Sequence, residues 1–106
     1  MRLTGQEAID LGWGDCNLWG YAWMEGARDL WLDVEHASAG RGSFRFTWVA
    51  GFKIAIDYAA NRSGPSLSWD VKFSIIDDRW ATVWNFAGEG SLEFTYQDVQ
   101  FVLHDG

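Results

Sequence analysis

Cysteine and proline are almost absent from this chain of 106 residues, which contains one of each. A lone cysteine, Cys16, cannot form an intrachain disulfide, and with two histidines the sequence offers no zinc-ligand spacing. Residues 1–11 lack the apolar core of a signal peptide. We therefore expect a cytoplasmic protein with no metal and no cofactor. The single proline, Pro65, predicts a loop.

Basic side chains are also scarce, with eight Lys and Arg against 15 Asp and Glu, a formal net charge of −7. Nucleic-acid affinity comes from Lys and Arg that displace counterions, so direct nucleic-acid binding is disfavoured. The same charge would steer the protein toward a basic partner protein. The alternative is that the acidic surface serves solubility alone.

Long hydrophobic runs are missing as well, and no stretch approaches the roughly 18 apolar residues of a membrane-spanning helix. Aromatic residues, in contrast, are abundant, with eight Trp, seven Phe and three Tyr. This length supports one domain, residues 1–106, with one core. A domain of this size buries some Trp and can display others, and contiguous exposed Trp would form a binding surface.

The stretch from Phe44 to Tyr58 carries the clearest pattern. Large apolar residues occupy alternate positions on both sides of an Ala50-Gly51 break, which is the period of a strand with one face on a core. Two consecutive strands are predicted. Their predicted core residues are Phe44, Phe46, Trp48, Phe52, Ile54 and Ile56.

The same alternation recurs along the chain. Six further short strands are predicted, over residues 16–24, 29–36, 67–75, 80–86, 92–96 and 99–103. About eight strands with short loops indicate an all-β fold, an antiparallel meander that forms a small sandwich or barrel. A short N-terminal helix from Gly5 to Leu11 is predicted from a capping box between Thr4 and Glu7; the alternative is a loosely ordered arm.

One candidate ligand site is the aromatic row Trp19, Tyr21 and Trp23. Alternation would place these rings on one face of a strand, roughly 7 Å apart, a spacing that suits stacking on successive sugar rings. The composition resembles that of acidic, Trp-rich carbohydrate-binding modules. The alternative is that the row packs inside the sandwich.

A candidate partner-binding surface combines one tryptophan with outward-facing carboxylates. Its members are Trp31, Asp33, Glu35, Asp57 and Asp70. Such a field suits the basic cleft of a nuclease or toxin. A plain solvated strand face has the same appearance.

Catalysis is not expected. Paired carboxylates act on glycosides only across a cleft, for which a small meander offers little room. His36 and His104 lie beside no evident nucleophile, and a lone Cys16 at the start of a strand is typical of a small buried hydrophobe.

Several segments together resemble those of small bacterial all-β proteins, some of which are immunity proteins encoded beside secreted toxins. The segments are Gly14-Asp15-Cys16, Asp29 to Val34, Phe46 to Ile54 and Gly88-Glu89-Gly90. The resemblance implies a cytosolic, acidic binding protein that occludes a partner. With the net charge and the surplus Trp, the leading hypothesis is a non-enzymatic, inhibitory or immunity-type module that binds a basic partner. The alternatives are a carbohydrate or small-ligand binding domain and a self-associating subunit that dimerises through a Trp-rich face.

Overall fold

The computed structural model describes residues 2–56, 66–86 and 90–104. These residues form nine strands and one four-residue helix. In chain order the elements are β1 (Arg2–Thr4), α1 (Gln6–Ile9), β2 (Asn17–Met24), β3 (Asp29–His36), β4 (Gly40–Thr47), β5 (Ala50–Ile56), β6 (Ser66–Ile76), β7 (Arg79–Phe86), β8 (Gly90–Tyr96) and β9 (Asp98–Leu103). The loop predicted around Pro65, together with Asp57 and Tyr58, lies outside the described residues.

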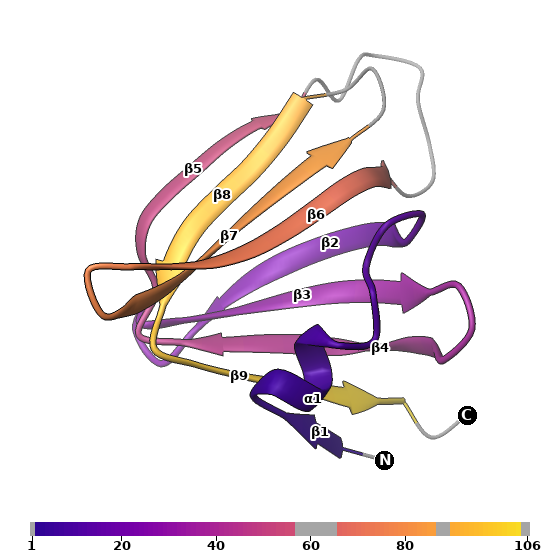
Figure 1. Ribbon diagram of the computed structural model, residues 1–106, viewed down its shortest axis with the longest axis horizontal. Helices are drawn as coiled ribbons and strands as arrows, with labels where there is room; N and C mark the ends of the chain where they lie inside the picture. Colours follow the sequence, from indigo (N-terminus) through magenta and orange to yellow (C-terminus); the bar gives the residue numbers. More distant parts are fainter. Residues whose placement is uncertain (1, 57–65, 87–89, 105–106) are drawn as a thin grey trace.

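The strands form two antiparallel layers, which confirms the predicted all-β class (Figure 1). One layer has the order β1-β9-β4-β3-β2 and the other β6-β7-β8-β5. The layers join where β2 and β6 pair over two residues each, Asn17 with Leu67 and Leu18 with Ser66. The order departs from a simple meander, because β9 inserts between β1 and β4, and β5 pairs with β8. The two strands predicted between Phe44 and Tyr58 therefore belong to different layers.

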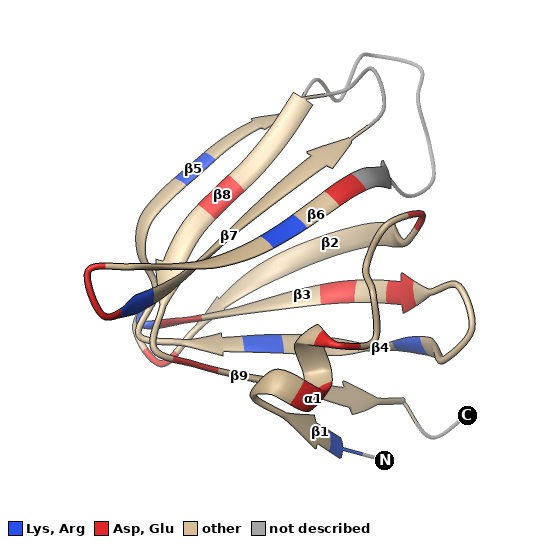
Figure 2. Ribbon diagram, in the orientation of Figure 1, with Lys and Arg blue, Asp and Glu red and all other residues tan. Residues whose placement is uncertain are grey.

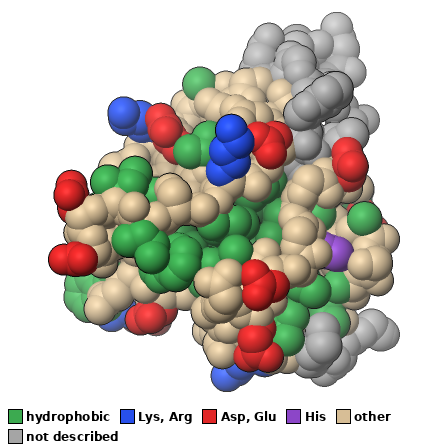
Figure 3. Space-filling model, in the orientation of Figure 1, with side chains coloured by type: hydrophobic (Ala, Val, Ile, Leu, Met, Phe, Trp, Pro, Cys, Tyr) green, Lys and Arg blue, Asp and Glu red, His purple; other side chains and the backbone are tan. Residues whose placement is uncertain are grey.

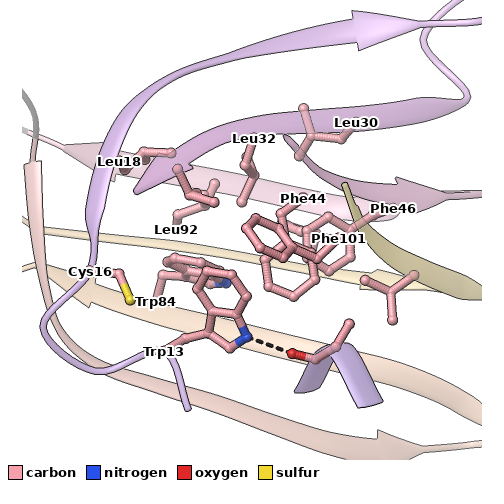
Figure 4. Close-up of a cluster of buried hydrophobic side chains, with 14 of the residues drawn as sticks. Trp13, Cys16, Leu18, Leu30, Leu32, Phe44, Phe46, Trp84, Leu92 and Phe101 are labelled. Carbon is pink, nitrogen blue, oxygen red and sulfur yellow. Dashed lines mark hydrogen bonds between the residues drawn. The ribbon is translucent and has the colours of Figure 1, made fainter. Parts of the chain in front are cut away.

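Aromatic and branched side chains from both layers fill the space between them (Figure 4). Fully buried examples are Leu30, Leu32, Val34, Phe44, Phe46, Trp84, Leu92, Tyr96 and Phe101. Trp13 reaches this cluster from the segment after α1, with its ring 4.4 Å from that of Phe44 and 4.9 Å from that of Phe101. Its indole Nε1 donates to the Ala8 carbonyl over 2.8 Å, so one side chain ties the helix to the core. Hydrophobic side chains between the layers reach the surface on one side (Figure 3).

The N-terminal helix is present but shorter than predicted, and the predicted capping box is wrong. The N-cap residue is Gly5, at φ 54°, with no side-chain cap. Thr4 instead ends β1, where it pairs with Gln100, and the Gly5 amide donates to the Val99 carbonyl. Sheet pairing by β1, which the sequence pattern did not predict, holds Thr4 outside the helix.

A β-bulge interrupts β2 between Leu18 and Gly20, and its extra residue is Trp19. A bulge places two residues opposite one, so the alternation of faces reverses after it. Tyr21 therefore pairs with the buried Leu32, and Trp23 with the buried Leu30. Both rings face the opposite layer, 5.8 Å and 4.9 Å from the ring of Phe52.

The predicted core of the Phe44–Tyr58 stretch is confirmed at four positions and wrong at one, and the side chain of Ile56 is not among those that the structure describes. Phe44 and Phe46 are fully buried, and Phe52 and Ile54 pack against the core. Trp48 is 54% exposed, so its assignment to the core is wrong. The strand alternation stops at Thr47, because the chain there leaves one layer for the other.

Candidate functional site

Trp48 lies at the centre of a charged cluster where β4 passes into β5. Its amide donates to Oδ1 of Asp29 over 3.2 Å, and its carbonyl accepts from Nη2 of Arg79. The guanidinium of Arg28 lies 4.9 Å from the centroid of the indole ring. We call Trp48 and these three neighbours the Trp48 corner.

Asp29 is the residue that organises this corner. Its side chain accepts two hydrogen bonds from Arg28, each of 2.9 Å, and Asp29 as a whole is only 6% exposed. These bonds, with a further one from the Trp48 amide, lower the pKa of the Asp29 carboxyl, and the same contact raises the pKa of Arg28. Both groups are therefore charged at neutral pH, and the ion pair anchors the Trp48 backbone.

The backbone of Trp48 has φ 52°, in the left-handed region. A bulky side chain there is a conformational outlier, and such residues persist where the surrounding contacts over-determine them. Asp29 and Arg79 supply those contacts from β3 and β7. The fold thus anchors the backbone that carries an exposed indole ring.

Two tight turns with exposed carboxylates flank the ring. The turn between β2 and β3 contains Glu25, and the turn between β6 and β7 contains Asp77 and Asp78. These three carboxylates form no ion pair within the described part of the chain. Ile75 and Ile76, next to the second turn, are 64% and 54% exposed. In Figure 2 acidic positions mark the β6–β7 turn, at the left-hand end of the view, and the corner below it.

The predicted partner-binding residues do not form one surface. Trp31, Asp33 and Glu35 share the outer face of the five-stranded layer, as predicted. Asp70 belongs to β6 in the other layer, within 3.7 Å of Lys72, and Asp57 lies outside the described residues.

Both carboxylates on the Trp31 face accept hydrogen bonds, and Asp33 is neutralised by an ion pair. Arg41 donates two hydrogen bonds to Asp33, of 3.2 Å and 2.9 Å. Glu35 accepts from the Asn17 amide over 3.1 Å and from the Trp19 indole over 3.4 Å. This face is consequently less acidic than the sequence pattern predicts.

The predicted aromatic row is divided between two faces. Trp19 lies on the outer face, with Arg41 stacked on its ring at 4.5 Å, whereas Tyr21 and Trp23 point toward Phe52. The three rings remain 38–42% exposed, but they offer no continuous platform for a chain of sugars.

The remaining reactive side chains, Cys16 and His36, are buried and take part in the packing of the fold. Cys16 is fully buried, as expected, and burial raises the pKa of its thiol. His36 is buried as well: Nε2 lies 2.7 Å from the Gly12 carbonyl, and Nδ1 accepts from the amides of Ser38 and Ala39. Across the described ranges no cluster of three or more His, Cys, Asp or Glu side chains is arranged to hold a metal ion.

Comparisons with protein-family models, with curated proteins and with solved structures each found no significant match. Within residues 2–56, 66–86 and 90–104 no helix is long and apolar enough to cross a membrane. The surface of the protein is therefore what indicates a function. On that surface the sequence pattern missed Trp48, since the residue continues the alternation of Phe44 and Phe46 and carries no local signal of exposure.

Proposed function

We propose that this protein is a non-enzymatic, inhibitory binding module of the immunity type, and that it occludes a basic partner protein through the Trp48 corner. The observation that carries the proposal is the exposed ring of Trp48 on an anchored backbone, whose neighbours Arg28 and Arg79 adjoin two acidic turns. The partner that fits is a protein with an apolar pocket surrounded by Lys or Arg.

The energetics of interfaces support this choice. Binding energy concentrates in a few aromatic and arginine anchors, with Trp prominent among them, inside a rim that excludes water. A side chain that is ordered before binding loses little conformational entropy when the complex forms. At Trp48 the backbone is already anchored by Asp29 and Arg79, so less of the chain's conformational entropy is lost on binding.

Charge supports a basic partner. Within the Trp48 corner the pair Arg28–Asp29 is neutral as a unit. Glu25, Asp77 and Asp78 then outnumber Arg79, and the whole chain carries a net charge of −7. Complementary charge speeds association and excludes acidic competitors, and it makes association sensitive to salt.

The test is affinity capture from the native host at low ionic strength, followed by titration of the purified partner. Wild-type protein should retain a basic protein that elutes as salt is raised. Trp48→Gly should weaken the titrated affinity by about 30-fold, the loss typical of a central aromatic anchor. Lys72→Gln, an exposed change on β6 outside the Trp48 corner, should leave the affinity unchanged.

The paired substitution Asp77→Asn with Asp78→Asn should slow association and reduce its dependence on salt, because both changes remove rim charge. Capture of no basic protein would contradict the proposal. Full affinity in Trp48→Gly would place the interface elsewhere.

A further inference from the structure

A groove of about 390 Å³ lies on the outer face of the five-stranded layer, beside Trp31. Residues of β2 form one side, and Arg45 of β4 and His104 lie on the other. The groove exists because Gly20 and Ala22, which pair with Asp33 and Trp31, lack bulk. A methyl group added at Gly20 would meet no atom within 4 Å.

Arg45 gives the groove its charge. Its guanidinium lies 3.9 Å from the centroid of the Trp31 ring, and its Nε donates to Oγ of Ser43 over 3.3 Å. Among the residues that the structure describes, no carboxylate pairs with it. Arg41, four residues earlier on the same strand, forms an ion pair with Asp33 through two hydrogen bonds, so its charge is compensated. Arg45 therefore retains donors, and Asp33, which also lines the groove, is already neutralised.

Arg45 combines a ring contact with a charge that no carboxylate of the described residues compensates. Three other basic residues pair with carboxylates: Arg28 with Asp29, Arg41 with Asp33 and Lys72 with Asp70. Arg28 and Arg41 also lie over indole rings. Arg45 lies half-buried over the Trp31 ring and has no carboxylate partner among the described residues. A guanidinium held flat on an aromatic face is partly desolvated and keeps its outer N–H groups free to bind an anion with two parallel hydrogen bonds.

We propose that this groove binds a small organic anion, a carboxylate attached to a flat apolar ring. The carboxylate would accept hydrogen bonds from the free Nη donors of Arg45. The ring would occupy the space between Trp31 and the small residues Gly20 and Ala22. This site is separate from the Trp48 ring and does not depend on the proposed protein partner.

The probe is phenylacetate, titrated into uniformly ¹⁵N-labelled protein, with neutral phenylacetamide as the matched compound. Saturable shifts are expected for the Trp31 indole N–H and the Arg45 Nε–H. The amide cannot form the charge-assisted hydrogen bond, so the affinity for phenylacetamide should be lower than that for phenylacetate by about tenfold or more. Absence of saturable shifts at these two groups, or equal affinity for both compounds, would overturn the proposal.

Four variants separate the groove from general charge effects and from the Trp48 corner. Arg45→Gln should weaken phenylacetate binding about tenfold or more, whereas Lys72→Gln, which removes the same charge elsewhere, should not. Ala22→Leu fills the groove with Arg45 intact and should abolish binding even if Arg45→Gln fails to fold. Trp48→Gly should bind phenylacetate with wild-type affinity. Failure of the protein-partner proposal can therefore be distinguished from failure of the groove proposal. Unchanged binding in both Arg45→Gln and Ala22→Leu would refute the site.

Discussion

At the scale of single residues, Trp48 and Asp29 determine the conformation of the Trp48 corner. Trp48 combines exposure with a left-handed backbone, and Asp29 combines burial with a charge. A left-handed backbone at a bulky residue and a buried charge are each unfavourable in isolation. The hydrogen bond between Trp48 and Asp29, with the two bonds from Arg28 to Asp29, offsets these costs. The pair yields two predictions about stability, one for each residue.

Trp48→Gly should be more stable than Trp48→Ala by about 1 kcal/mol, because only glycine enters the left-handed region without a steric cost. Chemical denaturation of the two variants measures the difference. Equal stabilities would show that the backbone at this position relaxes. Both variants should lose partner binding alike, since both lack the ring.

Asp29→Asn should lower the free energy of unfolding at pH 7 by about 2 kcal/mol, since charged hydrogen bonds are stronger than neutral ones. The folded protein lowers the pKa of this carboxyl, so the carboxylate contributes stability above the unfolded value and loses it as pH falls. The stability difference between wild type and variant should therefore be complete above about pH 4 and shrink below it. A difference independent of pH would contradict the role of the Arg28–Asp29 pair.

At the scale of elements, β2 shows how one extra residue redirects a strand. Leu18 faces the core, Trp19 is the extra residue of the bulge, and Tyr21 and Trp23 face the core again. The bulge thus turns the rings of Tyr21 and Trp23 toward the opposite layer and leaves Gly20 and Ala22 to form the groove outside.

Deletion of Trp19 should preserve the fold, because it restores regular pairing while Tyr21 and Trp23 keep their face. Deletion of Ala22 is the matched control. It moves Trp23 to the outer face and should cost about 2 kcal/mol more, the scale of one large side chain leaving a core. Thermal denaturation compares the two, and an equal loss in both would mean that the bulge itself is needed for folding.

Two glycines, Gly42 in β4 and Gly20 in β2, differ in the space available for a side chain. A methyl group added at Gly42 would lie 2.5 Å from the Val102 carbonyl oxygen and 2.8 Å from the Phe101 ring. Gly42→Ala should therefore cost about 1–3 kcal/mol through overpacking. Gly20→Ala, where the space is open, should stay within about 0.5 kcal/mol of wild type. Similar stabilities for the two variants would show that β9 can shift away from β4.

At the scale of the whole molecule, one aromatic core joins two layers whose strands are distant in sequence. Phe44 and Phe46 of the first layer meet Trp84 and Phe94 of the second, with ring centroids 6.0 Å and 4.8 Å apart. Strand β5 completes the second layer at its edge, with Ile54 paired to the buried Leu92. Even this edge residue should matter for stability.

Ile54→Asp should destabilise the protein by about 2 kcal/mol or more, because it places a carboxylate against the core. Ala55→Asp puts the same group on the same strand, at an exposed position, and should change stability by about 0.5 kcal/mol or less. Chemical denaturation curves compare the two variants. A near-wild-type Ile54→Asp would show that the register of β5 with β8 is wrong.

The sequence by itself determined the fold class and most of the core. Alternation is a local consequence of the pleat, so Leu30, Leu32 and Val34 could be assigned inward and Trp31, Asp33 and Glu35 outward without knowledge of their partners. Only the tertiary structure decided the faces of Tyr21, Trp23 and Trp48. Those faces depend on a bulge and on a crossing between layers, which are set by strand pairing rather than by local pattern. The exposed Trp48 and the groove beside Arg45 are the result, because both form only where residues distant in sequence meet.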